Sequence, residues 1–229
     1  MKVLTNEKLI KRNGRLGQIA TFSGLLVLVG GMFVSFRYPN FSAFAWVALL
    51  IGFALSQIGL YFGNRWGRRP RPDELIDQGL KGLSDQYSIY HYSSPAAHFL
   101  VGPSGLWVIM PFHQVGKIVY EKGRWKQKGG SFMQRYLRIF AQEGLGRPDM
   151  EAASEVESVF KFMKKNFPEE TIPDPRPVLV FTSEKAELEV EGAPLLTIPM
   201  KKLKETIRKS TKENPIPPVL LTQINELLA

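Results

Sequence analysis

The sequence contains no cysteine and only three histidines among its 229 residues. The absence of thiols excludes disulfide bonds, cysteine-ligated zinc, iron–sulfur clusters and thiol catalysis. The histidines, His91, His98 and His113, are separated by seven and fifteen residues, a spacing that matches no compact zinc motif. We therefore expect no metal site and no cofactor.

Acidic residues are also missing from a long N-terminal stretch. The net charge of +9 lies entirely in the first 72 residues, because residues 73–229 carry 20 basic and 20 acidic side chains. A chain this basic invites a nucleic-acid interpretation. The uneven distribution instead points first to the apolar segments that the basic residues flank.

Two uncharged apolar segments, residues 17–36 and 41–62, lie within this basic region. A helix of about 20 residues spans roughly 30 Å, the thickness of the hydrocarbon core of a bilayer. The turn-like link at 37–40 makes the two helices antiparallel neighbours. We expect a transmembrane hairpin in the lipid bilayer, although a hairpin buried in a soluble protein and a signal peptide cleaved near Ala43–Ala45 are alternatives.

The flanking charges predict the orientation of this hairpin. Nine basic residues lie outside the two segments and one, Arg37, lies between them. Cytoplasmic flanks carry the excess of Lys and Arg, so we expect a cell (inner) membrane protein with both termini in the cytoplasm. Small residues recur every seven positions, a pattern that lets helix backbones approach closely in lipid. The predicted helix-packing positions are Gly17, Gly24, Gly31, Ala45, Gly52 and Gly59.

The chain divides further into a basic N-terminus (1–16), a basic linker (63–72), a cytoplasmic domain (73–212) and a C-terminal tail helix within 213–229. Hydrophobic periodicity and turn signals predict the domain's elements. Helices are expected near 73–83, 131–143, 151–166 and 200–209, and strands near 86–91, 97–101, 106–110, 117–121, 124–128, 177–181 and 195–198. This order indicates an α/β (α+β) domain on a mixed sheet.

Three stretches of the sequence, in this order, resemble a known protein family. DELIDQGLKGL places Glu74 in the first helix, and AAHFLVGPSGLWVI carries His98 and a Gly-Pro-x-Gly turn. VLVFTSEKAELEVEGAPLLTIPMKKLKETI closes with two strands and a helix. Together they resemble the nuclease-related domain, a family of the restriction-endonuclease-like fold, over about residues 73–209. The resemblance implies a mixed-sheet restriction-endonuclease-like domain preceded by the transmembrane hairpin.

The residues that would cut nucleic acid in that family are replaced. Ala97 stands where the family has an aspartate, and Met110 and Phe112 stand where it has Glu-x-Lys. Magnesium-dependent hydrolysis needs carboxylate oxygens and a stabilising cation, which these side chains do not supply. We expect a catalytically inactive binding or assembly module, an accessory subunit of a membrane complex with a protein partner or a homo-oligomer. The alternative is a membrane-tethered nuclease or nucleic-acid-binding protein whose displaced site uses Glu74 and His98.

One stretch of the domain combines basic and aromatic residues. Cations that contact phosphate and aromatics that stack on bases are typical of nucleic-acid surfaces. Anionic lipid, a partner protein or an ordinary solvated face would fit the same composition. The candidate patch comprises Lys117, Arg124, Trp125, Lys126, Lys128, Arg135 and Arg138.

Overall fold

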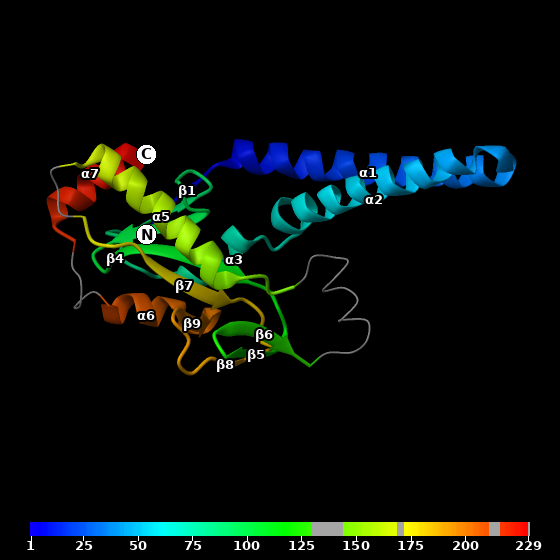
Figure 1. Cartoon of the computed structure of the whole chain (residues 1–229). Helices are drawn as coiled ribbons and strands as arrows, with labels where there is room; N and C mark the ends of the chain where they lie inside the picture. The colour runs from blue at the N-terminus through cyan, green and yellow to red at the C-terminus, as the bar shows by residue number, and fades with distance from the viewer. Residues whose placement is uncertain (130–143, 169–171, 211–215, 229) are drawn as a thin grey trace. The chain divides into compact units, whose positions relative to one another are not determined.

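The computed structural model describes residues 1–129, 144–168, 172–210 and 216–228 (Figure 1). The chain forms two compact units. One unit is the helical hairpin Glu7–Arg71. The other joins Met1–Asn6 to the described chain from Pro72 onward.

The hairpin consists of α1 (Glu7–Arg37) and α2 (Ser42–Phe62), joined through the short turn η1 (Pro39–Phe41). α2 continues into one π-helical turn, η2 (Gly63–Gly67). Both helices therefore extend past the apolar segments from which they were predicted. The basic stretches on either side of those segments are partly helical rather than free flanking chain.

The outer surface of the hairpin is apolar. Only 17% of the most apolar 18-residue window of each helix is buried. A core helix of a soluble protein would bury such a surface. Both helices are long and apolar enough to cross a membrane, so the expected pair of long apolar N-terminal helices is confirmed. The large exposed side chains include Phe22, Leu26, Phe33, Phe36, Trp46 and Leu50.

The two helices meet along their small residues. A Cβ on Gly31 would lie 2.5 Å from the Cβ of Ala48, whereas a Cβ on Gly30 would have no atom within 4 Å. A Cβ on Gly24 would lie 3.1 Å from the carbonyl oxygen of Gly52. Spacing by seven keeps residues on one helix face, so backbones come into close contact there. All six positions singled out from the sequence are buried: Gly17, Gly24, Gly31, Ala45, Gly52 and Gly59.

The second unit is built on a mixed six-stranded sheet of order β1-β2-β3-β4-β7-β9. The β2–β3 and β3–β4 pairs are antiparallel, and the β1–β2, β4–β7 and β7–β9 pairs are parallel. The predicted α/β domain with a mixed sheet is thereby confirmed. The strands are β1 (Lys2–Thr5), β2 (Ser88–His91), β3 (His98–Gly102), β4 (Gly105–Phe112), β7 (Arg176–Phe181) and β9 (Leu196–Pro199).

A smaller three-stranded sheet has the order β6-β5-β8. Its strands are β5 (Gly116–Glu121), β6 (Arg124–Lys128) and β8 (Ala186–Glu189). The β5–β6 hairpin turns at Lys122 and Gly123, whose φ angles of 52° and 72° are the left-handed pair that a two-residue hairpin loop requires. The sequence predicted β5 and β6 but not β8, and it did not separate them into a second sheet.

Helices cover the two faces of the large sheet (Figure 1). Side chains alternate along β4, so Val108, Met110 and Phe112 enter one apolar core while Trp107 and Ile109 enter the other. The first core, here called the α5 core, also contains residues of α5 (Pro148–Asn166) and α7 (Pro218–Leu228). The second, the α3 core, contains residues of α3 (Pro72–Leu80) and α6 (Leu203–Lys209), which follows the turn η3 (Met200–Lys202).

The N-terminal residues belong to the domain. The sequence assigned 1–16 to a basic flanking segment, but Lys2–Thr5 forms the edge strand β1 beside β2. The backbone N–H of Lys2 donates to the Tyr87 carbonyl at 2.8 Å, and that of Asn6 donates to the His91 carbonyl at 3.0 Å. The separate N-terminal region is therefore wrong as a domain boundary. Both flanks of the hairpin enter one compact unit.

The C-terminal helix also docks on its own domain. Leu220 and Ile224 of α7 are buried in the α5 core. The Tyr90 hydroxyl donates to the side-chain oxygen of Asn225 at 2.8 Å. The segment expected to be a separate tail thus completes the core. The helix expected at 131–143 lies outside the described residues.

Candidate functional site

The positions at which the family resemblance places catalytic residues come together in the sheet. β3 and β4 pair from Phe99 opposite Val108 onward, so Ala97, just before β3, and Met110, two residues after Val108, lie beyond the same end of this pairing. β4 then pairs with β7 so that Phe112 lies beside Phe181. Two of the three replaced positions, Met110 and Phe112, thus lie on the face that carries the α5 core.

Apolar side chains fill this location. Met110 and Phe112 are 5% and 8% exposed. The Phe112 ring stacks on Phe181, with centroids 5.6 Å apart and an interplanar angle of 24°. A hard divalent cation requires several oxygen ligands, and this stacked pair offers none.

One carboxylate approaches the same point. Glu155, on α5, accepts a hydrogen bond at 3.3 Å from the backbone N–H of Ala97. A single carboxylate that is bound to the backbone does not make a divalent metal site. Over the residues that the structure describes, no group of three His, Asp or Glu side chains is arranged to hold a metal ion.

A polar cluster lies on the opposite face of the sheet. Asp77 Oδ1, on α3, is 3.0 Å from His91 Nε2, and His91 Nδ1 is 2.8 Å from His98 Nδ1. His91 is fully buried and His98 is 3% exposed. The two rings face each other because β2 and β3 pair with His91 directly opposite His98.

The carboxylate sets the direction of the first hydrogen bond in this cluster. The Asp77 carboxylate accepts, so His91 donates through Nε2–H. Between the two rings, one Nδ1 donates and the other accepts. A chain of hydrogen bonds therefore links His98, His91 and the carboxylate. It holds α3 against the strands in a single arrangement.

The end of β1 and the loop after β2 support the histidine pair. Tyr92 adopts a left-handed backbone with φ of 57°, and its ring lies 4.9 Å from the His98 ring. The loop closes through a bond from the Tyr92 N–H to the Ala97 carbonyl at 2.9 Å. The Asn6 side chain donates to the Tyr92 carbonyl at 3.2 Å. The cluster is thus tied to the N-terminal strand as well as to α3.

The displaced catalytic candidates do not gather with the replaced positions. His98 belongs to the cluster on the α3 face, whereas Met110 and Phe112 enter the α5 core. Glu74 lies on α3, but Asp77 supplies the carboxylate that contacts His91. Sequence reasoning passed over Asp77. It follows Glu74 at i+3, which places both carboxylates on one helix face.

The described part of the candidate basic patch is largely neutralised by carboxylates. Lys117 Nζ lies 2.6 Å from Glu189, and both Lys126 and Lys128 pair with Glu121. The hydrogen bond that Lys117 donates to Glu189 raises the pKa of Lys117, and the hydrogen bond that Lys128 donates to Glu121 lowers the pKa of Glu121. Parallel β8 brings Glu189 beside β5, a pairing that the local sequence does not reveal. Arg135 and Arg138 lie outside the described residues.

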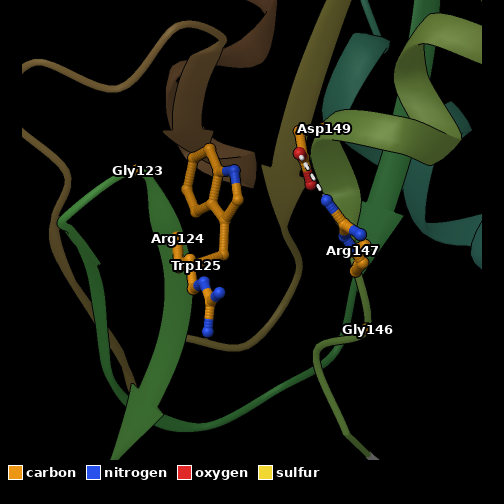
Figure 2. A pocket seen from close by; sticks show the side chains of 6 residues that line it. All are labelled: Gly123, Arg124, Trp125, Gly146, Arg147 and Asp149. Carbon is orange, nitrogen blue, oxygen red and sulfur yellow. Dashed lines mark ion pairs between the residues drawn. The ribbon is translucent and has the colours of Figure 1, made fainter.

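A pocket of about 360 Å³ lies at the end of the β5–β6 hairpin, and two residues of the candidate patch, Arg124 and Trp125, line it. Trp125 is 9% exposed and Arg124 beside it is exposed. Figure 2 shows the indole on one side and the Arg147–Asp149 ion pair on the other. The nitrogen edge of the indole faces that pair. The pocket is lined by Gly123, Arg124, Trp125, Gly146, Arg147 and Asp149.

Comparisons with family models, with curated proteins and with solved structures found no match to this chain. The residues themselves must therefore carry the functional argument. They provide an apolar filling where the family resemblance would place a metal, a buried histidine cluster, and a small pocket lined by two arginines and an aspartate.

Proposed function

We propose that this chain is a membrane-anchored protein whose mixed-sheet domain derives from the nuclease-related, restriction-endonuclease-like lineage and acts as a binding or assembly module without cutting nucleic acid. The observation that carries the proposal is the stacked, buried Phe112–Phe181 pair beside Met110. It occupies the place where hydrolysis would need carboxylates and an amine.

The apolar surface of the hairpin and its flanking charges support the membrane anchor. Basic residues surround the two apolar segments and only Arg37 lies between them, which favours cytoplasmic flanks in a bacterial-type inner membrane. Met1–Asn6 and the chain from Pro72 onward share one compact unit. Two spans return the chain to the side from which it started, so a domain built from both flanks fits the proposed topology.

The close-packed helix interface supports an anchoring role over transport. Neither apolar segment contains Asp, Glu, Lys, Arg or His, although such residues mark most ion and substrate paths through membranes. The hairpin instead presents an apolar outer face to lipid or to the helices of another subunit. We propose a membrane complex in which this chain is an accessory subunit.

The test has two arms on the full-length protein in mild detergent. In the first, supercoiled plasmid and single-stranded oligonucleotides are incubated with the protein and Mg²⁺ or Mn²⁺, beside a Glu74→Gln/His98→Gln variant. We expect no cleavage above that of the variant. Metal-dependent cleavage that the variant loses would overturn the proposal in favour of a nuclease with a displaced site.

The second arm identifies what the protein binds. The tagged chain is extracted gently from its own cells, and the co-purifying proteins are quantified by mass spectrometry. We expect a stoichiometric membrane protein or a homo-oligomer. Recovery of nucleic acid without either would contradict an assembly role.

A further inference from the structure

The pocket at the end of the β5–β6 hairpin contains a buried donor that lacks an acceptor. Trp125 is only 9% exposed, and its indole N–H has no hydrogen-bond partner in the described part of the chain. A buried donor without a partner costs about 1–3 kcal/mol. Such a group is explained if a ligand supplies the missing acceptor.

The other walls of the pocket also favour an anion. Arg124 and Arg147 contribute two guanidinium groups, and Asp149 contributes one carboxylate. The Arg147–Asp149 pair is long, at 3.7 Å, with the arginine side chain 71% exposed. An exposed pair of this length contributes little, so Arg147 can turn to an incoming anion at small cost.

The start of α5 borders the pocket and carries two carboxylates, Asp149 and Glu151, in its first turn. α5 begins at Pro148, directly after Arg147, and no side chain caps its N-terminus. The first N–H groups of a helix and its dipole favour a negative charge at that end. The indole, Arg147 and the helix end border the pocket from different elements: β6, the loop before α5, and α5 itself, while the Arg124 side chain extends from β6 away from the indole (Figure 2).

We propose that this pocket binds a phosphate group of a small phosphorylated molecule. Phosphate presents at least three acceptor oxygens in different directions, which suits an indole N–H and the Arg147 guanidinium on separate elements, with the Arg124 cation at the rim. A carboxylate has only two oxygens in one plane. The volume of about 360 Å³ lies at the small end for ligand sites, so the bound part is a phosphate with a small organic group. This site goes beyond the proposed function and does not depend on it.

Two kinds of ligand carry a phosphomonoester: a free phosphorylated metabolite and the headgroup of an anionic lipid such as phosphatidic acid. Binding is measured with the full-length protein in two arms. In the first, inorganic phosphate and AMP are titrated in detergent and followed by phosphorus NMR line broadening. In the second, the protein is placed in nanodiscs of phosphatidylcholine with or without phosphatidic acid, and the bound lipid is counted by native mass spectrometry.

Three variants and one control define the site. Trp125→Phe removes the N–H and keeps an aromatic ring, while Arg124→Gln and Arg147→Gln each remove one cation. Lys161→Gln, an exposed charge change farther along α5, is the matched control. We expect each of the three site variants to lose about fivefold to tenfold in affinity, which is the effect of removing one charge-assisted hydrogen bond. The control should lose no affinity.

Each outcome is decisive. Site-sensitive binding of inorganic phosphate or AMP identifies a free phosphate ligand, and site-sensitive enrichment of phosphatidic acid alone identifies a headgroup. Saturable binding in neither arm, or equal losses in Lys161→Gln, would overturn the proposal. If Trp125→Phe does not fold by circular dichroism, the exposed Arg124→Gln variant still decides the result.

Discussion

Replacing the membrane hairpin tests whether the N-terminal strand is part of the domain. β1 ends before Glu7, and α3 begins at Pro72. A flexible Gly/Ser linker in place of Glu7–Arg71 would therefore join the two parts of the compact unit. Linkers of about 10–30 residues span roughly 17–30 Å, so a short series covers the separation. We expect this hairpin-free chain to be soluble and folded, and the fragment from Pro72 alone to be less stable.

The magnitude follows from the bonds that β1 makes. Lys2 and Asn6 donate backbone hydrogen bonds to the Tyr87 and His91 carbonyls, and the Asn6 side chain donates to Tyr92. At about 0.5–1 kcal/mol each, these bonds contribute about 2 kcal/mol. Partial burial of Leu4 against the α5 core adds about 1 kcal/mol. Loss of about 3 kcal/mol would lower the melting temperature by roughly 6–12 °C in a domain of this size.

Two proline variants of the hairpin-free chain provide the matched comparison. Lys2 and Asn6 both donate toward β2, so the even-numbered N–H groups face the sheet and that of Val3 faces outward. Leu4→Pro removes a ladder donor, whereas Val3→Pro removes an N–H on the open edge. Melting is followed by circular dichroism. Equal melting temperatures for the fragment, the two variants and the hairpin-free chain would refute the assignment of β1 to this sheet.

Three further predictions concern the helix interface, the buried cluster and the small sheet. Gly31→Leu should lower the melting temperature of the full-length protein in detergent because its side chain would enter the facing helix, whereas Gly30→Leu should not, since open space surrounds that position. Asp77→Ala should destabilise the hairpin-free chain by about 1–3 kcal/mol in urea by leaving a buried imidazole donor unpaired; an equal effect of the exposed Gln78→Ala would contradict this. The pKa of Glu121 in the folded protein is lowered from the ordinary value of 4.5. Its ion pairing therefore stabilises the fold fully at pH values above 4.5, and this stabilisation is lost as the pH falls through the lower pKa of the folded state. Carbon-detected NMR of the carboxylate should show a midpoint below 4.5 that rises in Lys128→Gln, and an unchanged midpoint would refute the pairing.

Long-range pairing explains most of what sequence reasoning missed. β1 is only four residues long, and its partner β2 begins 86 positions after it in the paired register, so no local periodicity reveals it. The neutralisation of Lys117 has the same origin, because Glu189 reaches it only when β8 pairs with β5. Asp77 was overlooked because its meaning depends on the two histidines that the β2–β3 register brings together.

The sequence alone determined the features that depend on local composition and period. The two long apolar helices, the seven-residue spacing of their small residues and most strands of a mixed-sheet domain could be predicted because hydrophobic pattern and turn chemistry act over a few residues. The tertiary structure decided which sheet face each side chain enters. It placed Met110 and Phe112 in the α5 core and His91 and His98 beside Asp77 on the other face of the sheet. It also left the indole N–H of Trp125 without a partner in a pocket that two arginines line. These arrangements depend on residues that are distant in the sequence and come together only when the strands pair.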